Sequence, residues 1–206
     1  MTAEITFLFM GTVLGLSAGF SPGPLLTLVV SESLKYGKSE GMKVALSPLI
    51  TDVPIVAATI FLLSRLPDIQ IILGIISFAG AVFLIHLGWE NIRFGGMNLD
   101  AASVKPQSLK KGIVANFLSP NPYLFWLTIG APTAIKASDA GFLPPSLFLL
   151  GFYICLVGAK VIVAVVIGSS RQFLKSRIYI WINRFLGALL LVFAVMFLWD
   201  GIKFLF

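Results

Sequence analysis

The chain has 206 residues, of which 58% are hydrophobic and 12% are charged, and its formal net charge is +6. Ordinary soluble domains carry about 25% charged residues, so this composition excludes a soluble globule. The length allows six membrane spans of about 20 residues with short loops, and it leaves no room for a second, soluble domain.

Apolar runs predict six transmembrane helices, so we expect an all-α membrane protein. The whole chain, 1–206, would form a single transmembrane domain. The expected spans cover about residues 5–30, 44–63, 69–88, 113–133, 145–168 and 178–199.

Two pairs of motifs recur along the chain. Ser21-Pro22-Gly23-Pro24 is followed 98 residues later by Ser119-Pro120-Asn121-Pro122. Trp89-Glu90-Asn91-Ile92-Arg93-Phe94 has a counterpart in Trp199-Asp200-Gly201-Ile202-Lys203-Phe204, which keeps aromatic, acid, isoleucine, base and phenylalanine in order. Both matches fall at corresponding places in two halves of three spans, which indicates an internal repeat.

The repeat divides the chain into residues 1–94 and 105–206, with a linker at about 95–104. Because three is an odd number of spans, the second half must enter the membrane upside down relative to the first. The sequence therefore predicts two inverted three-helix repeats, the arrangement of many secondary transporters.

Each repeat contains paired prolines inside an apolar span, at positions 22 and 24 and at positions 120 and 122. A proline in a helix interior supplies no N–H and clashes with the carbonyl four residues back. Two prolines at i and i+2 should therefore open helices 1 and 4. Open backbone inside a membrane is tolerated where protein or a water-filled cavity receives it, which points to a binding site.

The basic residues of the loops predict the orientation. The linkers after spans one, three and five hold three, four and three Lys or Arg residues, whereas the other loops and the two termini together hold three. The positive-inside rule places the richer set in the cytoplasm and both termini outside. We therefore interpret the net charge as retention of loops at a cytoplasmic membrane, with no nucleic acid as partner.

Asp52 and Lys160 are ionisable residues inside predicted spans. Each lies eight residues from the cytoplasmic end of its span, about 12 Å deep, where insertion costs about 2.5–3.5 kcal/mol. One interpretation is an ion pair that only stabilises the bundle. The other is a site for an amino acid, whose carboxylate meets Lys160 and the N–H groups after Pro24 while its ammonium meets Asp52 and freed carbonyls.

The expected substrate site combines these two residues, both proline motifs and a nearby asparagine. Burial favours the protonated form of a carboxyl group, so Asp52 is also the candidate for proton coupling. The expected site residues are Ser21, Pro22, Gly23, Pro24, Asp52, Asn116, Ser119, Pro120, Asn121, Pro122 and Lys160.

Other residues carry weaker signals. The single histidine, His86, argues against a histidine-built metal site and suits the membrane interface. The single cysteine, Cys155, excludes a thiol pair and suits a small core residue. Arg184 can reach the cytoplasmic face as an anchor. Trp126 either lines a cavity or packs against lipid.

Glycines at 11, 15, 19 and 23 make one bare face on the first span. Small residues at this spacing let a second helix approach closely. The pattern leaves open whether the partner helix belongs to the same chain or to a second copy in a homo-oligomer.

These residues together resemble the LysE-type (lysine exporter) family of amino-acid exporters. The resemblance implies a six-span inner-membrane exporter of amino acids or related small metabolites, driven by an ion gradient. Two departures bear on the substrate: Tyr123 stands where we expect Lys, and Ser47-Pro48 stands where small residues are usual. The matching positions are Pro22-Gly23-Pro24, Gly37, Gly41, Asp52, Gly112, Asn116, Asn121-Pro122 and Phe125.

The expected function is export of amino acids or related zwitterionic metabolites by alternating access, coupled to protons and without a cofactor. An inorganic-ion transporter is the alternative, although the spans lack clusters of His and acidic residues. A thiol or electron carrier would need paired cysteines. An intramembrane enzyme would need a nucleophile beside a general base, and the sequence offers no such pair.

Overall fold

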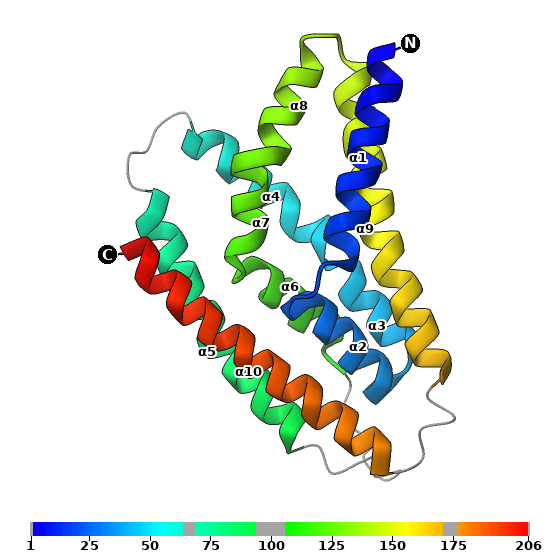
Figure 1. Cartoon of the computed structure of the whole chain (residues 1–206), viewed down its shortest axis with the longest axis vertical. Coiled ribbons are helices and arrows are strands. Elements are labelled where there is room, and N and C mark those ends of the chain that lie inside the picture. Colours follow the sequence, from blue (N-terminus) through cyan, green and yellow to red (C-terminus); the bar gives the residue numbers. More distant parts are fainter. Residues whose placement is uncertain (1, 64–68, 94–105, 171–176, 206) are drawn as a thin grey trace.

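The computed structural model describes residues 2–63, 69–93, 106–170 and 177–205, and over these residues it contains helices and no strand (Figure 1). The expected linker, 95–104, lies outside the described residues. The helices are α1 (Thr2–Phe20), α2 (Pro24–Tyr36), α3 (Lys38–Ala45), α4 (Ser47–Leu63), α5 (Ile69–Ile92), α6 (Ser108–Phe117), α7 (Pro120–Phe125), α8 (Ala131–Ser138), α9 (Leu143–Ser170) and α10 (Arg177–Leu205). A π-helical turn, η2 (Trp126–Gly130), joins α7 to α8.

Among the described residues, five segments are long and apolar enough to cross a membrane. The predicted span at 113–133 is not among them, because it is divided among α6, α7, η2 and α8. The predicted span at 5–30 is divided between α1 and α2. The five segments are Ala3–Phe20, Lys38–Thr59, Gln70–Ile92, Leu143–Ser170 and Ile180–Leu205.

Helices end just before each proline motif and begin again within it. Gly23 has extended backbone (φ −175°, ψ 177°) and precedes α2, which begins at Pro24. Ser119 precedes α7, which begins at Pro120. A proline at the first helical position loses little, because the N–H that it lacks would have no partner inside the helix. The same residues that cannot continue one helix therefore start the next.

The glycine face of α1 lies against α9 of the same chain, and the two helices run side by side in Figure 1. A Cβ atom added at Gly11 would lie 2.2 Å from the carbonyl oxygen of Phe148, and one at Gly15 would lie 2.3 Å from that of Phe152. Gly19 faces the Ala159 side chain in the same way. These three glycines thus serve a contact within the chain, whereas a Cβ at Gly23 would meet no atom within 4 Å.

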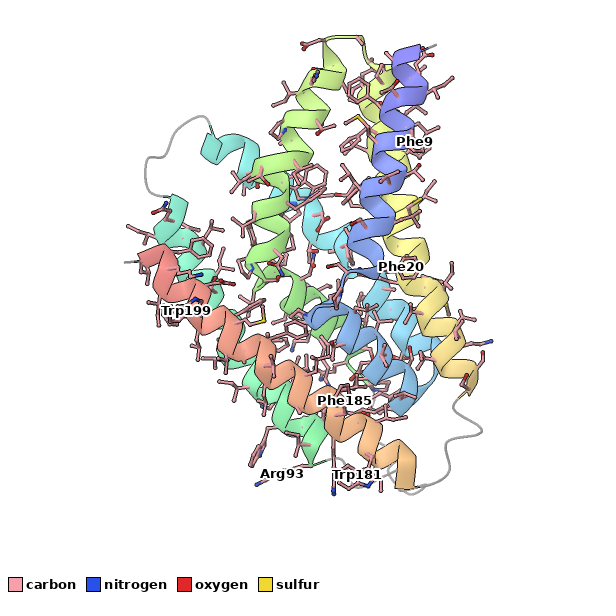
Figure 2. The ribbon with its side chains drawn as sticks, viewed as in Figure 1. Phe9, Phe20, Arg93, Trp181, Phe185 and Trp199 are labelled. Atoms are coloured by element: carbon pink, nitrogen blue, oxygen red, sulfur yellow. The ribbon has the colours of Figure 1, made fainter. Side chains whose placement is uncertain are left out.

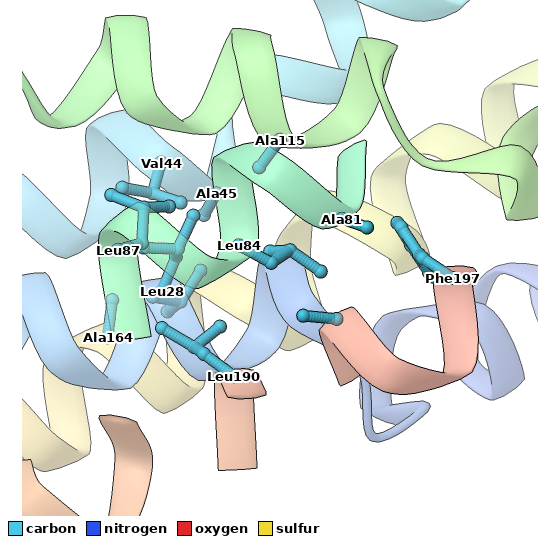
Figure 3. Close-up of a cluster of buried hydrophobic side chains, with 12 residues drawn as sticks. Leu28, Val44, Ala45, Ala81, Leu84, Leu87, Ala115, Ala164, Leu190 and Phe197 are labelled. Carbon is cyan, nitrogen blue, oxygen red and sulfur yellow. The ribbon is translucent and has the colours of Figure 1, made fainter. Parts of the chain in front are cut away.

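Helices α5 and α10 form a second long pair, which a buried apolar cluster joins to the central helices. Leu28 from α2, Val44 from α3, Leu84 from α5 and Leu190 from α10 belong to this cluster (Figure 3).

The outer surface carries large apolar side chains, including Phe9, Trp181 and Phe185, each 67% exposed (Figure 2). So extensive an exposed apolar surface suits a lipid environment.

A partly buried charge network connects α2, α5 and α6. We use this name for Glu32, Lys35, Glu90 and Lys111. Lys111 Nζ lies 2.7 Å from Glu90 Oε1 and 3.4 Å from Glu32 Oε1, and Lys35 Nζ lies 3.7 Å from Glu90 Oε1. Glu32, only 1% exposed, also accepts a hydrogen bond of 2.5 Å from the Ser108 hydroxyl. The network fixes the far end of α2 relative to two helices that are distant in sequence.

Lys111 lies outside the five apolar segments, and its protonation state is set by this network. Burial acts to lower its pKa, but the charges of Glu32 and Glu90 outweigh burial and raise the pKa above its ordinary value of 10.5. The folded state therefore holds this proton more tightly than the unfolded state does. The resulting stabilisation is complete below the ordinary pKa and is lost as the pH rises through the raised one.

We expect Gly15→Ala to destabilise the protein by about 1–3 kcal/mol, because the new methyl group would collide with the α9 backbone. Thermal unfolding of the detergent-solubilised protein, followed by tryptophan fluorescence, measures this. Gly158→Ala on α9 is the control, since a Cβ there meets no atom within 4 Å, and it should raise stability by up to about 1 kcal/mol. Equal melting temperatures for the two variants would contradict the close approach of α1 to α9.

We expect Lys111→Met to destabilise the protein, because Glu32 and Glu90 lose their shared cation. Removing one partner from a buried ion pair costs about 3–5 kcal/mol, and the lower end applies here because Glu90 keeps contact with solvent. The deficit should shrink as the pH rises through the raised pKa of Lys111. The neighbouring exposed residue gives the control, since Lys110→Met should change stability by less than about 0.5 kcal/mol. Similar melting curves for both variants would show that Glu32 and Glu90 do not depend on Lys111 as their cation.

Candidate functional site

A cavity of about 460 Å³ lies among α1, α2, α4, α6, α7, η2 and α9. Its volume falls in the range of about 300–1,000 Å³ typical of small-molecule sites. Of the eleven residues expected at the substrate site, Pro120 does not line the cavity. The other ten do: Ser21, Pro22, Gly23, Pro24, Asp52, Asn116, Ser119, Asn121, Pro122 and Lys160.

Asp52 is held on one wall of the cavity by donors from two other elements. Asn116 Nδ2 of α6 donates to Asp52 Oδ1 at 3.1 Å and to the Thr51 hydroxyl at 2.6 Å. Trp126 Nε1 of η2 lies 3.5 Å from Asp52 Oδ2. The side chain is 4% exposed. These neutral donors orient the carboxylate without neutralising its charge.

Lys160 also lines the cavity, from α9, and is likewise 4% exposed. Its ammonium donates to the carbonyl oxygens of Ala18 at 3.0 Å and Gly19 at 2.9 Å. The Ala18 carbonyl would bond residue 22 in a continuous helix, but Pro22 has no N–H. Lys160 therefore satisfies the last turn of α1, where the helix dipole favours a cation.

Asp52 and Lys160 are both described by the structure, and no ion pair within 4.0 Å joins them. The structure therefore does not form the pair that the first interpretation of these residues required. Each charge is held separately by its own neutral partners. An ammonium has three donors and two are used here, so one N–H of Lys160 is left for the cavity.

The start of α2 also borders the cavity, through Leu25 and Leu26. Gly23 offers no side-chain cap, and Pro24 has no N–H to contribute. The first N–H groups of a helix have no partner inside it, so those of Leu25 and Leu26 are unsatisfied donors at its positive end. The second motif differs, because the Ser119 hydroxyl accepts from the backbone N–H of Asn121 at 3.3 Å and caps α7 itself.

Aromatic residues form another wall of the cavity. We call Phe125, Trp126 and Phe152 the aromatic wall; all three line the cavity, and Trp126 is 1% exposed. Trp126 therefore lines the cavity and does not face lipid, which decides the question that the sequence left open. The sequence analysis missed Phe152 and its neighbour Tyr153, which lies near Asp52. Tyr153 lies seven residues before Lys160, two helical turns, and this spacing could have revealed it.

Three other residues with weaker signals in the sequence, His86, Arg184 and Cys155, do not line the cavity. His86 is exposed, and Arg184 is exposed and lies over the Trp181 ring with its guanidinium 6.0 Å from the ring centroid. Cys155 is half-buried. Tyr123 donates to the Phe117 carbonyl at 3.0 Å and is not among the lining residues.

Over the part of the chain that the structure describes, no group of three or more His, Cys, Asp or Glu side chains could hold a metal ion.

Comparison with known proteins identifies the family of this chain. The LysE type translocator family model matches residues 16–201, a range that contains both proline motifs, Asp52 and Lys160. No curated protein and no solved structure matched the chain. The family match and the several apolar helices indicate a multi-pass membrane protein with a transporter role. The chain belongs to the LysE type translocator family.

Proposed function

We propose that this translocator exports amino acids or related small zwitterions across the cytoplasmic membrane, coupled to protons and by alternating access. The observation that carries the proposal is the separation of charge inside the cavity. An acid lies on one side and an amine beside an uncapped helix start on another, and they do not pair with each other.

A zwitterion complements both sides of this cavity. Its carboxylate would accept from the remaining donor of Lys160 and from the N–H groups of Leu25 and Leu26. Its ammonium would donate to Asp52, which Asn116 already orients. A buried charge without a counter-charge is costly, so a ligand that supplies both opposite charges at once is favoured over one that supplies a single charge.

In the proposed architecture, residues 113–133, which are divided among α6, α7, η2 and α8, form the fourth of six spans. The ends of α1 and α6 just before the two proline motifs support broken first and fourth helices. Residues 1–94 and 105–206 are then inverted repeats, and the distribution of basic residues supports placing both termini outside.

Alternating access requires an element that moves relative to its neighbours, and α2 is our candidate. One end of α2 borders the cavity at Pro24, and Glu32 lies eight residues further, about 12 Å along the helix. In the proposed cycle, the charge network holds α2 against α5 and α6 in one state and opens in the other. The links from Glu32 to Ser108 and Lys111 support this assignment.

The test is exchange of radiolabelled amino acids in proteoliposomes, with metal ions assayed in parallel. We expect amino acids to exchange faster than in protein-free liposomes, and Lys160→Met to reduce this exchange by tenfold or more. Lys136→Met on α8 is the matched control, since Lys136 is exposed and is not among the residues that line the cavity. Exchange of a metal ion and of no amino acid would refute the proposal and favour an inorganic-ion transporter.

Asp52→Asn tests the coupling role separately. Asparagine keeps the shape, and its Oδ1 can accept from Asn116 as Asp52 Oδ1 does, whereas its Nδ2 cannot accept from Trp126. It cannot bind or release a proton. We expect an imposed pH gradient to accelerate transport by the wild type. The same gradient should have no effect on Asp52→Asn, tested at substrate concentrations where this variant still exchanges the amino acid. Asp139→Asn, at an exposed residue after α8, should respond as the wild type does. A full response by Asp52→Asn would remove Asp52 from proton coupling.

A further inference from the structure

The aromatic wall suggests which class of amino acid the cavity accepts, an inference that rests on the function proposed above. Phe125, Trp126 and Phe152 lie beside one another, with ring centroids 5.0–5.6 Å apart. Leu14, Ile129 and Leu156 extend the same apolar lining. Asp52 lies next to this surface, because Trp126 belongs to the wall and also donates to Asp52.

In the proposed binding mode, the ammonium and carboxylate groups of an amino acid pair with both charges of the cavity. Asp52 and Lys160 are the two charged residues among those that line it. A substrate with a charged side chain would bring a third charge to an apolar wall, where an unpaired charge is costly. A small side chain would leave the wall uncovered. Both considerations favour a neutral side chain of substantial apolar area.

The aromatic rings could in principle bind a cation over their faces. Here Phe152 has two stacked partners, and Phe125 and Trp126 have one each. Phe152 stacks on Phe125 at 5.0 Å and on Phe148 at 6.4 Å, and Trp126 stacks on Tyr153 at 6.3 Å. A ring face covered by another ring offers no site for an ammonium group. The wall therefore suits apolar contact better than it suits a lysine or arginine side chain.

The size of the cavity agrees with this reasoning. Its volume of about 460 Å³ falls within the range of about 300–1,000 Å³ that small-molecule sites occupy. This leaves room for a branched or aromatic side chain beside the ammonium and carboxylate groups.

We propose that the substrate is a neutral amino acid with a large apolar side chain, such as leucine or phenylalanine, which rests on Phe125, Trp126 and Phe152. Its ammonium lies at Asp52 and its carboxylate lies between Lys160 and the start of α2. The aromatic wall thus determines specificity, and the two charges determine that the substrate is an amino acid.

The experiment measures kcat/KM for exchange of leucine, phenylalanine, alanine, serine, lysine and glutamate in proteoliposomes containing the full chain. Exchange needs no ion gradient, so the ranking does not depend on the coupling ion. Each extra methylene in an apolar site is worth about tenfold or more. We therefore expect leucine and phenylalanine to exceed alanine and serine by at least about tenfold, with lysine and glutamate lowest.

Phe125→Ala tests the wall itself, because Phe125 is only half-buried and its truncation should be tolerated. We expect the ratio of kcat/KM for leucine over alanine to fall about tenfold, mainly through a higher KM for leucine. Phe152→Leu should lower the preference for phenylalanine over leucine. Phe148→Leu is its matched control on α9, since Phe148 stacks on Phe152 but does not line the cavity, and it should keep the wild-type ratios.

The outcomes separate this inference from the proposed function. If lysine, glutamate or serine exchanges fastest, the apolar specificity is wrong while amino-acid transport stands. If no amino acid exchanges faster than in protein-free liposomes, the proposed function fails and the specificity fails with it. If a variant does not fold, the ranking measured on the wild-type protein still decides between these results.

Discussion

The site depends on backbone hydrogen bonds that Pro22 and Pro24 cannot make. Unsatisfied backbone groups in an apolar environment cost several kcal/mol each, so a helix end inside a membrane protein requires a partner. Lys160 supplies that partner for the carbonyls of Ala18 and Gly19. The start of α2 has no side-chain cap, and its residues Leu25 and Leu26 line the cavity. One interrupted helix thereby fixes a buried ammonium and presents two backbone donors beside it.

The two proline motifs have similar sequences but different chemical roles. In the first, glycine precedes the second proline and leaves the start of α2 uncapped. In the second, Ser119 caps α7 through the backbone of Asn121, and Asn116 one turn earlier orients Asp52. Donors and a cation therefore gather near the first motif, and the acid lies near the second. In the proposed inverted repeat, identical motifs would favour a symmetric ligand, whereas this difference gives the cavity a polarity that suits the proposed zwitterion.

The sequence predicted those parts of the site that depend on single residues in an unfavourable place, such as a proline inside a helix or a charge inside a membrane span. Paired prolines and charges inside apolar runs are unfavourable wherever they occur, so these residues and the polar or small residues near them supplied ten of the residues that line the cavity. It did not predict which groups meet. Lys160 bonds carbonyls 142 and 141 residues away and is not paired with Asp52, and Glu32 bonds Ser108 across 76 residues. The glycine spacing likewise predicted a close contact for α1 but could not identify α9 as its partner. Such contacts depend on how the helices pack, which short patterns do not encode.

The charge network has the energetic properties that a reversible contact needs. Desolvation of buried ions roughly offsets their attraction, so such a network contributes little net stability. Removing one ion from its partners is costly all the same, because the remaining charge is then buried without a counter-charge. When water enters, the separated charges are solvated again and the cost of opening falls. The 13-residue helix α2 connects this network to the cavity. In the proposed cycle, a ligand carboxylate at the start of α2 would therefore act on the same helix that Glu32 holds at its other end. Binding of substrate would then favour either the closed or the open state of the network.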